Sequence, residues 1–321
     1  PTAGGTTMVS IVPASRRATV AGQPADPGHR SSRRHGLGRS RSRLGLLYAA
    51  PTAVIVATLF VIPLGLMVWM SFNHWPLLGA SAPNGVDNYR ALADPLFGRA
   101  VIFTLKYTAV TTVVLSLIAF GLALLVQDAR PGVGLLRTSF FLPAGVGLAS
   151  TSLLFYGLFN NEGSPLNATL RALHLDGVDW LGTSNSALGS TVGMITWRFA
   201  GFYMLILLTG LQAIDPTLYE AARTDGANRW QLLRGVTLPL LRPTIALMMV
   251  LSVTGSLLAF DQFFILTGGR HETATIVIDI YREAFLSQNL GRAAAVSVVT
   301  LIVLIVLNVG QLLAIRRDDH R

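Results

Sequence analysis

The sequence predicts an all-α integral membrane protein with six transmembrane helices, and three observations carry this prediction. Only 13% of the 321 residues are charged, whereas about 25% is usual for a soluble domain. Hydrophobic residues make up 51% of the chain, and the mean hydropathy is +0.54. The apolar residues gather in blocks of about 20, and a helix of that length crosses the hydrocarbon core of a bilayer. This composition argues against a soluble globular enzyme.

Six apolar segments are each long enough to cross as a helix. They are Leu46–Met70, Val101–Val126, Ser139–Phe159, Leu188–Gly210, Ile245–Leu266 and Ala293–Ile315. Pro51, Pro63 and Pro143 are expected to kink their spans. Residues 1–43 contain eight arginines and one acid, Asp26, and are predicted to form a flexible basic cytoplasmic tail. Residues 44–321 are predicted to form the six-helix transmembrane domain.

The arginines and the lysine in the loops predict the orientation of the spans. With the N-terminal tail placed inside, the inner segments carry 17 positive residues and the outer loops carry 6. Positive residues are retained on the cytoplasmic side of a membrane. Both termini are therefore predicted to be cytoplasmic, in a multi-pass membrane protein.

Several function classes are excluded by residues that the chain lacks. It has no cysteine, so it forms no disulfide, thiolate nucleophile or cysteine metal site. Its one lysine, Lys106, does not follow a glycine, so the chain cannot form an ATP-hydrolysing P-loop. No metal-binding or hydrolase motif is present. We expect no cofactor on this chain, and we expect the tail arginines to meet anionic lipid rather than nucleic acid.

The longest inner loop, residues 211–243, is predicted to form two short helices. Asp215 and Pro216 are typical of a helix start, and Asp225-Gly226 can end that helix. Asn228 can cap the second helix. Leu238-Pro239 and Arg242-Pro243 are expected to stop it before the next span. Taken alone, this loop could be an amphipathic connector at the membrane surface.

The spacing within that loop gives it a more specific interpretation. Glu220-Ala221-Ala222, three residues, Gly226, nine residues, Val236, one residue and Leu238-Pro239 resembles the EAA motif of ABC importer permeases. The fuller form, with Asp225, Gly226 and Ala227 after the two alanines, is also met. Ala259-Phe260-Asp261 through Leu266-Thr267-Gly268-Gly269 is similar to the sugar and glycerol-phosphate branch, the half like the maltose permease's larger subunit. The sequence departs from this branch at Arg270-His271-Glu272.

The resemblance implies a permease subunit with the type I ABC importer fold in a bacterial plasma (inner) membrane. Such a subunit is not itself an enzyme. It implies four kinds of contact: a second homologous permease, two copies of an ATPase that bind ATP and Mg, an extracytoplasmic solute-binding protein or lipoprotein, and membrane lipid. The residues expected to couple the chain to the ATPase are Glu220, Ala221, Ala222, Asp225, Gly226, Ala227, Leu238 and Pro239.

The solute path is predicted from aromatic and polar residues inside the spans. Aromatic rings stack on sugar rings, and amides or carboxylates bind hydroxyls. The candidates are Tyr156, Trp197, Tyr203, Asp261, Gln262 and Asn308. Arg198 and Asp261 could form an intramembrane ion pair. An ion-gradient-driven secondary carrier, with these two charges as coupling groups, is the alternative function, and a receptor or scaffold without transport is a third class.

Overall fold

The computed structural model describes residues 48–128, 130–160 and 163–318, with side chains as far as residue 313. The predicted basic tail, residues 1–43, lies outside the described residues. The chain forms two units, Pro1–Ala57 and Thr58–Arg321. The first unit is helical from Tyr48 onward, and all elements from α2 onward belong to the second unit.

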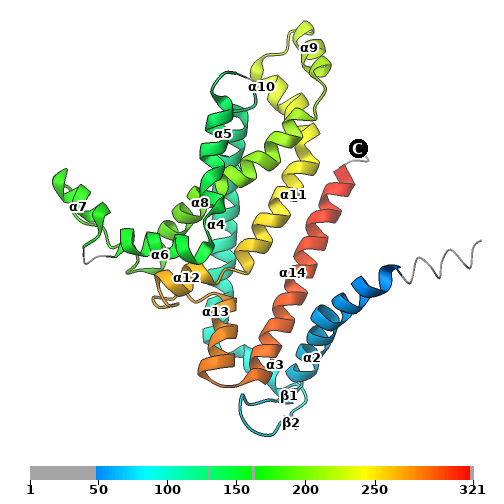
Figure 1. Ribbon diagram of the computed structural model, residues 1–321, viewed down its shortest axis with the longest axis vertical. Helices are drawn as coiled ribbons and strands as arrows, with labels where there is room; N and C mark the ends of the chain where they lie inside the picture. Colours follow the sequence, from blue (N-terminus) through cyan, green and yellow to red (C-terminus); the bar gives the residue numbers. More distant parts are fainter. Residues whose placement is uncertain (1–47, 129, 161–162, 319–321) are drawn as a thin grey trace, which may run out of the picture. The chain divides into compact units, whose positions relative to one another are not determined.

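Helices make up almost all of the described structure (Figure 1). In chain order, the elements are η1 (Ala57–Val61), α2 (Ile62–Ser71), β1 (Asn73–His74), β2 (Ala82–Pro83), α3 (Asp87–Arg90), η2 (Ala91–Ala93), α4 (Pro95–Leu125), α5 (Val133–Phe141), η3 (Leu142–Gly145), α6 (Leu148–Phe159), α7 (Pro165–Ala172), α8 (Ser184–Gln212), α9 (Pro216–Thr224), α10 (Arg229–Leu232), η4 (Leu233–Thr237), α11 (Leu238–Leu257), α12 (Asp261–Leu266), α13 (Ile276–Tyr281), η5 (Arg282–Leu286) and α14 (Leu290–Asp318).

Five helices in the described part of the chain are long and apolar enough to cross a membrane by themselves. They are Tyr48–Ser71, Pro95–Leu125, Ser184–Gln212, Arg229–Leu257 and Leu290–Leu313. A sixth crossing is available if Val133–Gly145 and Leu148–Phe159 act as one bent pair. The prediction of an all-α membrane protein is confirmed, and the predicted number of six spans is reached when the bent pair is taken as one span.

The third predicted span, Ser139–Phe159, is not one straight helix. It breaks at Val146 and Gly147, and the two halves meet at 93°. Pro143 lies in the 3₁₀ turn η3 directly before the break, and both Val146 and Gly147 have extended ψ angles of 136° and 145°. Proline is compatible with the first turn of a new helix but removes an N–H from a continuing one. The expected kink is therefore a complete interruption.

The fifth predicted span, Ile245–Leu266, is displaced toward the N-terminus. The helix begins at Arg229 and ends at Leu257, and α12 starts separately at Asp261. The prediction that Leu238-Pro239 and Arg242-Pro243 stop the helix is wrong. Pro239 lies inside this continuous helix, directly after the π-helical turn η4, where the regular hydrogen-bond pattern that a proline interrupts is already altered. Pro243 is accommodated inside α11.

The pair α4 and α8 forms the centre of the second unit, and α11 packs against both. Ala119, Ala123, Met204, Leu207 and Leu241 have almost no exposed surface in this core. The close approach of α5 requires Gly201, because a Cβ there would lie 1.9 Å from the Phe140 carbonyl oxygen. These packed helices hold the loops at their two ends in place.

At one end of the bundle, the segment after α2 joins the start of α14. Strands β1 and β2 pair antiparallel, with Asn73 opposite Pro83, and Pro76 bridges to Asn289. Arg292 on α14 contacts Asp94 at 3.2 Å and Glu283 at 3.4 Å. The opposite end carries α9 and α10 (Figure 1).

Candidate functional site

The EAA loop, residues 211–243, is a helix-turn-helix whose ends are fixed by local hydrogen bonds. Asp215 Oδ1 accepts from the Thr217 amide at 2.9 Å and caps α9. This amide holds the pKa of Asp215 below its usual range. At the other end of α9, Gly226 has φ +85°, and the Ala227 amide donates to the Ala222 carbonyl at 3.0 Å. The predicted start and end of the first helix are confirmed.

The second helix of the loop has a complete capping box. Asn228 Oδ1 accepts from the amides of Trp230 and Gln231, both at 3.0 Å. Gln231 Oε1 accepts in return from the Asn228 amide at 2.7 Å. Such a reciprocal pair satisfies amides that a helix start leaves open. The turn between α9 and α10 is therefore fixed by side chains as well as by Gly226.

The loop is fastened to the bundle by one polar and several apolar contacts. Tyr219 on α9 and Thr237 in η4 share a hydrogen bond of 3.0 Å between their hydroxyls, and the Thr237 side chain is buried. Ile214 and Leu232 are also buried. These contacts set the position of α9 relative to α11.

The residues of the EAA motif lie on the accessible surface of this helix-turn-helix. Glu220, Ala221, Asp225 and Gly226 are exposed, whereas Ala222, Ala227, Leu238 and Pro239 are partly buried. Among the described residues, no hydrogen bond or ion pair holds the Glu220 carboxylate. Trp230 is 62% exposed. The surface therefore offers a carboxylate, small side chains and an aromatic ring to a partner.

A cavity of about 190 Å³, here called the bundle cavity, lies among α4, α6, α8, α11 and α12. Its wall combines apolar residues with six polar side chains: Tyr107, Thr111, Tyr203, Ser252, Ser256 and Gln262. Gln262 Nε2 donates to the Tyr107 hydroxyl at 3.3 Å. The Gln262 Oε1 and Thr111 Oγ1 atoms are buried without a hydrogen-bond partner. Buried polar atoms are normally paired, so these two atoms are exceptions within the wall of the bundle cavity.

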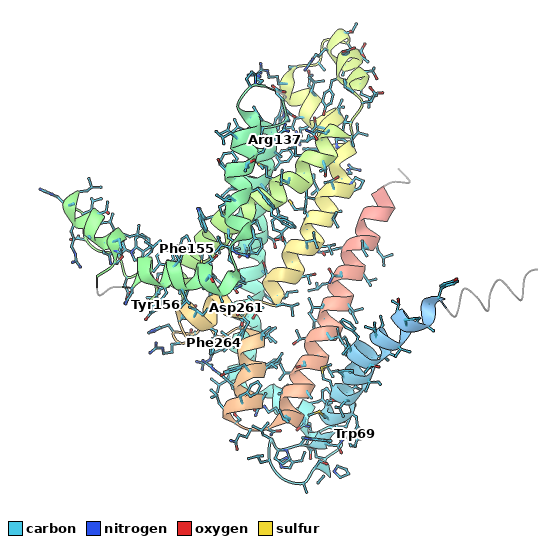
Figure 2. All side chains as sticks on the ribbon, in the orientation of Figure 1. Trp69, Arg137, Phe155, Tyr156, Asp261 and Phe264 are labelled. Carbon is cyan, nitrogen blue, oxygen red and sulfur yellow. The ribbon has the colours of Figure 1, made fainter. Side chains whose placement is uncertain are left out.

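The structure brings together only two of the six predicted path residues, Tyr203 and Gln262, in the bundle cavity. Asp261 is partly buried in the first turn of α12. Figure 2 shows Tyr156 on α6, beside α12, where it lines a different pocket.

Trp197 and Asn308 have other contacts. Trp197 is 46% exposed and packs against Phe155, with ring centroids 5.3 Å apart. Asn308 accepts from the Thr254 hydroxyl at 3.1 Å and donates to the Leu304 carbonyl. These contacts give Asn308 a role in joining α11 to α14.

Sequence reasoning missed four of the polar residues of the bundle cavity. Tyr107 and Thr111 are four residues apart on α4, and Ser252 and Ser256 are four apart on α11. Residues at this spacing share one face of a helix. Two polar pairs at this spacing inside apolar helices are the signal that could have identified them.

Arg198 donates to backbone carbonyls and does not form the expected ion pair with Asp261. Its side chain is buried, and Nε donates to the Val146 carbonyl at 2.9 Å. A terminal nitrogen reaches the same oxygen and the Ala144 carbonyl at 3.5 Å. Val146 lies at the break between η3 and α6, where backbone carbonyls have no helical partner. Arg198 thus supplies donors to the broken span, and no described ion pair joins it to Asp261.

Apolar spans around a polar cavity, with a separate exposed helix-turn-helix, define a multi-span membrane permease. Comparison with known proteins identifies its family. The family model of binding-protein-dependent transport system inner membrane components matches residues 39–317. The chain belongs to this family. It is a multi-pass inner-membrane permease subunit with the type I ABC importer fold, and it is not an enzyme.

Three relatives illustrate the similarity. The probable starch degradation products transport system permease protein AmyD of Thermoanaerobacterium thermosulfurigenes is 28% identical, over 83% of this chain and 91% of that protein. The trehalose/maltose transport system permease protein MalF of Thermococcus litoralis is 30% identical, over 82% of this chain and 90% of that protein. The crystal structure of a bacterial ABC transporter involved in the import of the acidic polysaccharide alginate has a chain with a TM-score of 0.75 and 26% identity. That match covers 87% of this chain and 98% of the other.

Proposed function

We propose that this chain forms half of the transmembrane path of an ATP-driven importer for a sugar or a related polar solute. The observation that carries this proposal is the EAA loop, where Glu220 and Ala221 are exposed on a fixed helix-turn-helix. A partner can approach the small side chains of Ala221 and Ala222 closely, and one of its arginines can reach the Glu220 carboxylate. This partner is an ATPase subunit that binds ATP and Mg and is present in two copies.

The sidedness of the loop follows from the distribution of arginines. Inner segments carry 17 positive residues against 6 in the outer loops, so the EAA loop and both termini lie on the cytoplasmic side. The ATPase then docks from the cytoplasm. A second, homologous permease completes the path, and an extracytoplasmic binding protein or lipoprotein delivers the solute at the other end.

The side chains that line the bundle cavity are of the kinds that bind a polyhydroxylated solute. Its wall presents two phenol rings, from Tyr107 and Tyr203, together with hydroxyls and the Gln262 carboxamide. Rings of this kind stack on the apolar face of a sugar, and the polar groups match its hydroxyls. The similar proteins named above are permeases for starch degradation products and for trehalose and maltose. The bundle cavity is thus proposed as part of the sugar path.

The gradient-driven alternative is less well supported. It relied on Arg198 and Asp261 as coupling charges, but the Arg198 guanidinium is committed to the Val146 and Ala144 carbonyls. A carrier would also have no need for the EAA surface.

The experiment that tests the proposal is co-purification from native membranes in mild detergent. We expect this chain to recover an ATPase, a second permease and a binding protein. In the Glu220→Ala, Gly226→Pro double variant, we expect the ATPase to be lost while the second permease is retained. The matched control is Asp128→Ala, which removes an exposed acid from another predicted cytoplasmic loop. Equal recovery of the ATPase with the double variant and the wild type would refute the role of the EAA loop.

A further inference from the structure

A tight turn at residues 84–87 leads from β2 into α3, at the end of the bundle opposite α9 and α10 (Figure 1). The Asp87 amide donates to the Asn84 carbonyl at 3.3 Å and closes the turn. Gly85 has φ +62°, a conformation that glycine adopts without strain. Asn84 is the only asparagine in the sequence that a glycine follows. The turn therefore combines a carboxamide side chain with a following residue that has no Cβ.

This combination of residues has a characteristic chemistry, the loss of the side-chain amide. The Gly85 backbone nitrogen forms a bond to Asn84 Cγ, the Cγ–Nδ2 bond breaks, and the proton of the attacking nitrogen leaves with the amide as ammonia. The product is a five-membered succinimide ring. One water molecule then opens the ring to a carboxylate and a proton, and gives aspartate or isoaspartate according to which ring carbonyl it attacks. Water is the only co-reactant, and a Cβ on the following residue would hinder the first step.

The Gly85 amide is well placed to act as the nucleophile. The Asn84 amide donates to the Phe72 carbonyl at 3.2 Å, but within the described residues the Gly85 N–H donates to no acceptor. Gly85 is exposed, and a Cβ added there would meet nothing within 4 Å. Water and hydroxide therefore reach this peptide group, and its nitrogen can lose a proton without breaking a hydrogen bond of the fold.

One hydrogen bond restrains the reacting carboxamide. Asn84 Nδ2 donates to Asn88 Oδ1 at 3.1 Å, whereas Asn84 Oδ1 has no hydrogen-bond partner. A single hydrogen bond between neutral groups makes only a modest net contribution to stability. The carboxamide can therefore turn toward the Gly85 nitrogen when this one bond opens, so the fold slows the reaction without preventing it.

The partner of Asn84 determines what the reaction does to the fold. The Asn88 side chain is buried, and its Nδ2 donates to the carbonyls of Ser71 and Asn73, both at 2.9 Å. These two bonds fix the carboxamide of Asn88 with its Oδ1 toward Asn84. An ionised carboxylate only accepts hydrogen bonds. Deamidation thus replaces the donor that faces Asn88 Oδ1 with a charged acceptor, and Asn88 cannot rotate to meet it without losing both of its other bonds.

Asn88 lies where three helices meet. Ser71 ends α2, Asn88 belongs to α3, and Gly291 is in the first turn of α14. A Cβ on Gly291 would lie 2.2 Å from the Asn73 carbonyl oxygen and 3.0 Å from Asn88 Nδ2. The contact is thus close enough to require glycine, and a displacement of Asn88 is transmitted to both α2 and α14.

We infer that Asn84 is a deamidation site of the folded protein, and that its conversion to aspartate or isoaspartate loosens the junction of α2, α3 and α14. Gly85 supplies the attacking nitrogen, and Asn88 both restrains the reaction and transmits its effect. The modification is irreversible without a repair enzyme, so it accumulates with the age of the molecule. It is independent of the solute and of the partner subunits.

The site is tested by incubating the full chain in lipid nanodiscs and following each asparagine by peptide mass spectrometry. We expect conversion at Asn84 to be faster than at Asn185, which precedes a serine, and to rise with pH because the Gly85 nitrogen must lose a proton. Asn88→Ala removes the restraint and should speed conversion by about two- to tenfold. Asn84→Gln is the matched control, because a glutamine would have to form a six-membered ring and should stay unmodified. Conversion at Asn84 that is no faster than at Asn185, or that does not respond to pH, would overturn the assignment.

The effect on the junction is tested with Asn84→Asp, which has the same side chain as the aspartate product. We expect a lower midpoint of thermal unfolding than in the wild type. In the Asn88→Ala background the carboxylate no longer faces an oxygen, so the difference between asparagine and aspartate at residue 84 should largely disappear, as a double-mutant cycle can show. Equal midpoints for Asn84→Asp and the wild type, or the same loss in both backgrounds, would show that Asn88 does not transmit the modification and would overturn this part of the inference.

Discussion

The turn at Gly226 allows a quantitative test of the EAA surface. Gly226 has φ +85°, and a Cβ added there would meet nothing within 4 Å. The penalty for another residue is therefore conformational and not steric. A left-handed backbone costs an ordinary L-residue about 1–2 kcal/mol, which lowers the population of the observed turn by about 5- to 30-fold. Gly226→Ala should weaken ATPase binding by this factor.

The matched variant is Gly226→Asn, because asparagine tolerates the left-handed region better than alanine. We expect Gly226→Asn to bind the ATPase more tightly than Gly226→Ala and close to the wild type. The assay is equilibrium binding of the purified ATPase to the permease complex in nanodiscs. Wild-type affinity in Gly226→Ala, or equal losses in both variants, would refute the reasoning that the turn conformation sets the docking geometry.

Three further predictions concern the helices and their ends. Arg198→Leu leaves the Val146 carbonyl without its donor and should destabilise the protein by about 1–3 kcal/mol, which is seen as a lower midpoint of thermal unfolding in detergent. Gly201→Val places side-chain atoms against the Phe140 backbone and should cost about 1–3 kcal/mol or more, whereas Gly193→Ala, which meets nothing within 4 Å, should not. The Leu96 amide and Arg292 hold the pKa of Asp94 below its usual range, so the stability from Asp94 is present above the unfolded pKa of about 3.9 and is lost as pH falls through the lower folded pKa. Thermal unfolding of wild type and Asp94→Asn from pH 7 to pH 3 should therefore converge on acidification, and a constant difference would contradict this assignment.

The parts of the fold that the sequence predicts well depend on local chemistry. Asp215, Gly226 and Asn228 were predicted as helix ends, and each is found in that role. A cap is made with amides one to three residues away, so the information lies within the motif itself. The apolar blocks likewise predict spans, because length and hydropathy are properties of one segment.

The bend in the third span could not be predicted in the same way. Pro143 predicts a kink, but the complete break needs donors for the freed carbonyls. Arg198 supplies one to Val146, which is 52 residues earlier in the chain. A contact of this kind depends on how α8 packs against the broken span. Sequence reasoning considered Arg198 with an acid and could not weigh it against backbone carbonyls.

The candidate solute path was predicted in part for a related reason. Asp261 and Gln262 are neighbours, and only Gln262 lines the bundle cavity. Because α11 ends at Leu257 and α12 begins at Asp261, the helical phase of α11 does not carry over to α12. Successive residues on a helix point about 100° apart, so the break decides which of the two faces the cavity.

The central claim is that this permease works as half of an ATP-driven importer. The most direct test is solute uptake into proteoliposomes that contain this chain with its second permease and ATPase, with the binding protein added on the outside and ATP enclosed. We expect uptake that requires both ATP and the binding protein and is lost in the Glu220→Ala, Gly226→Pro double variant. Uptake that proceeds without ATP, driven by an ion gradient across the vesicle membrane, would contradict it.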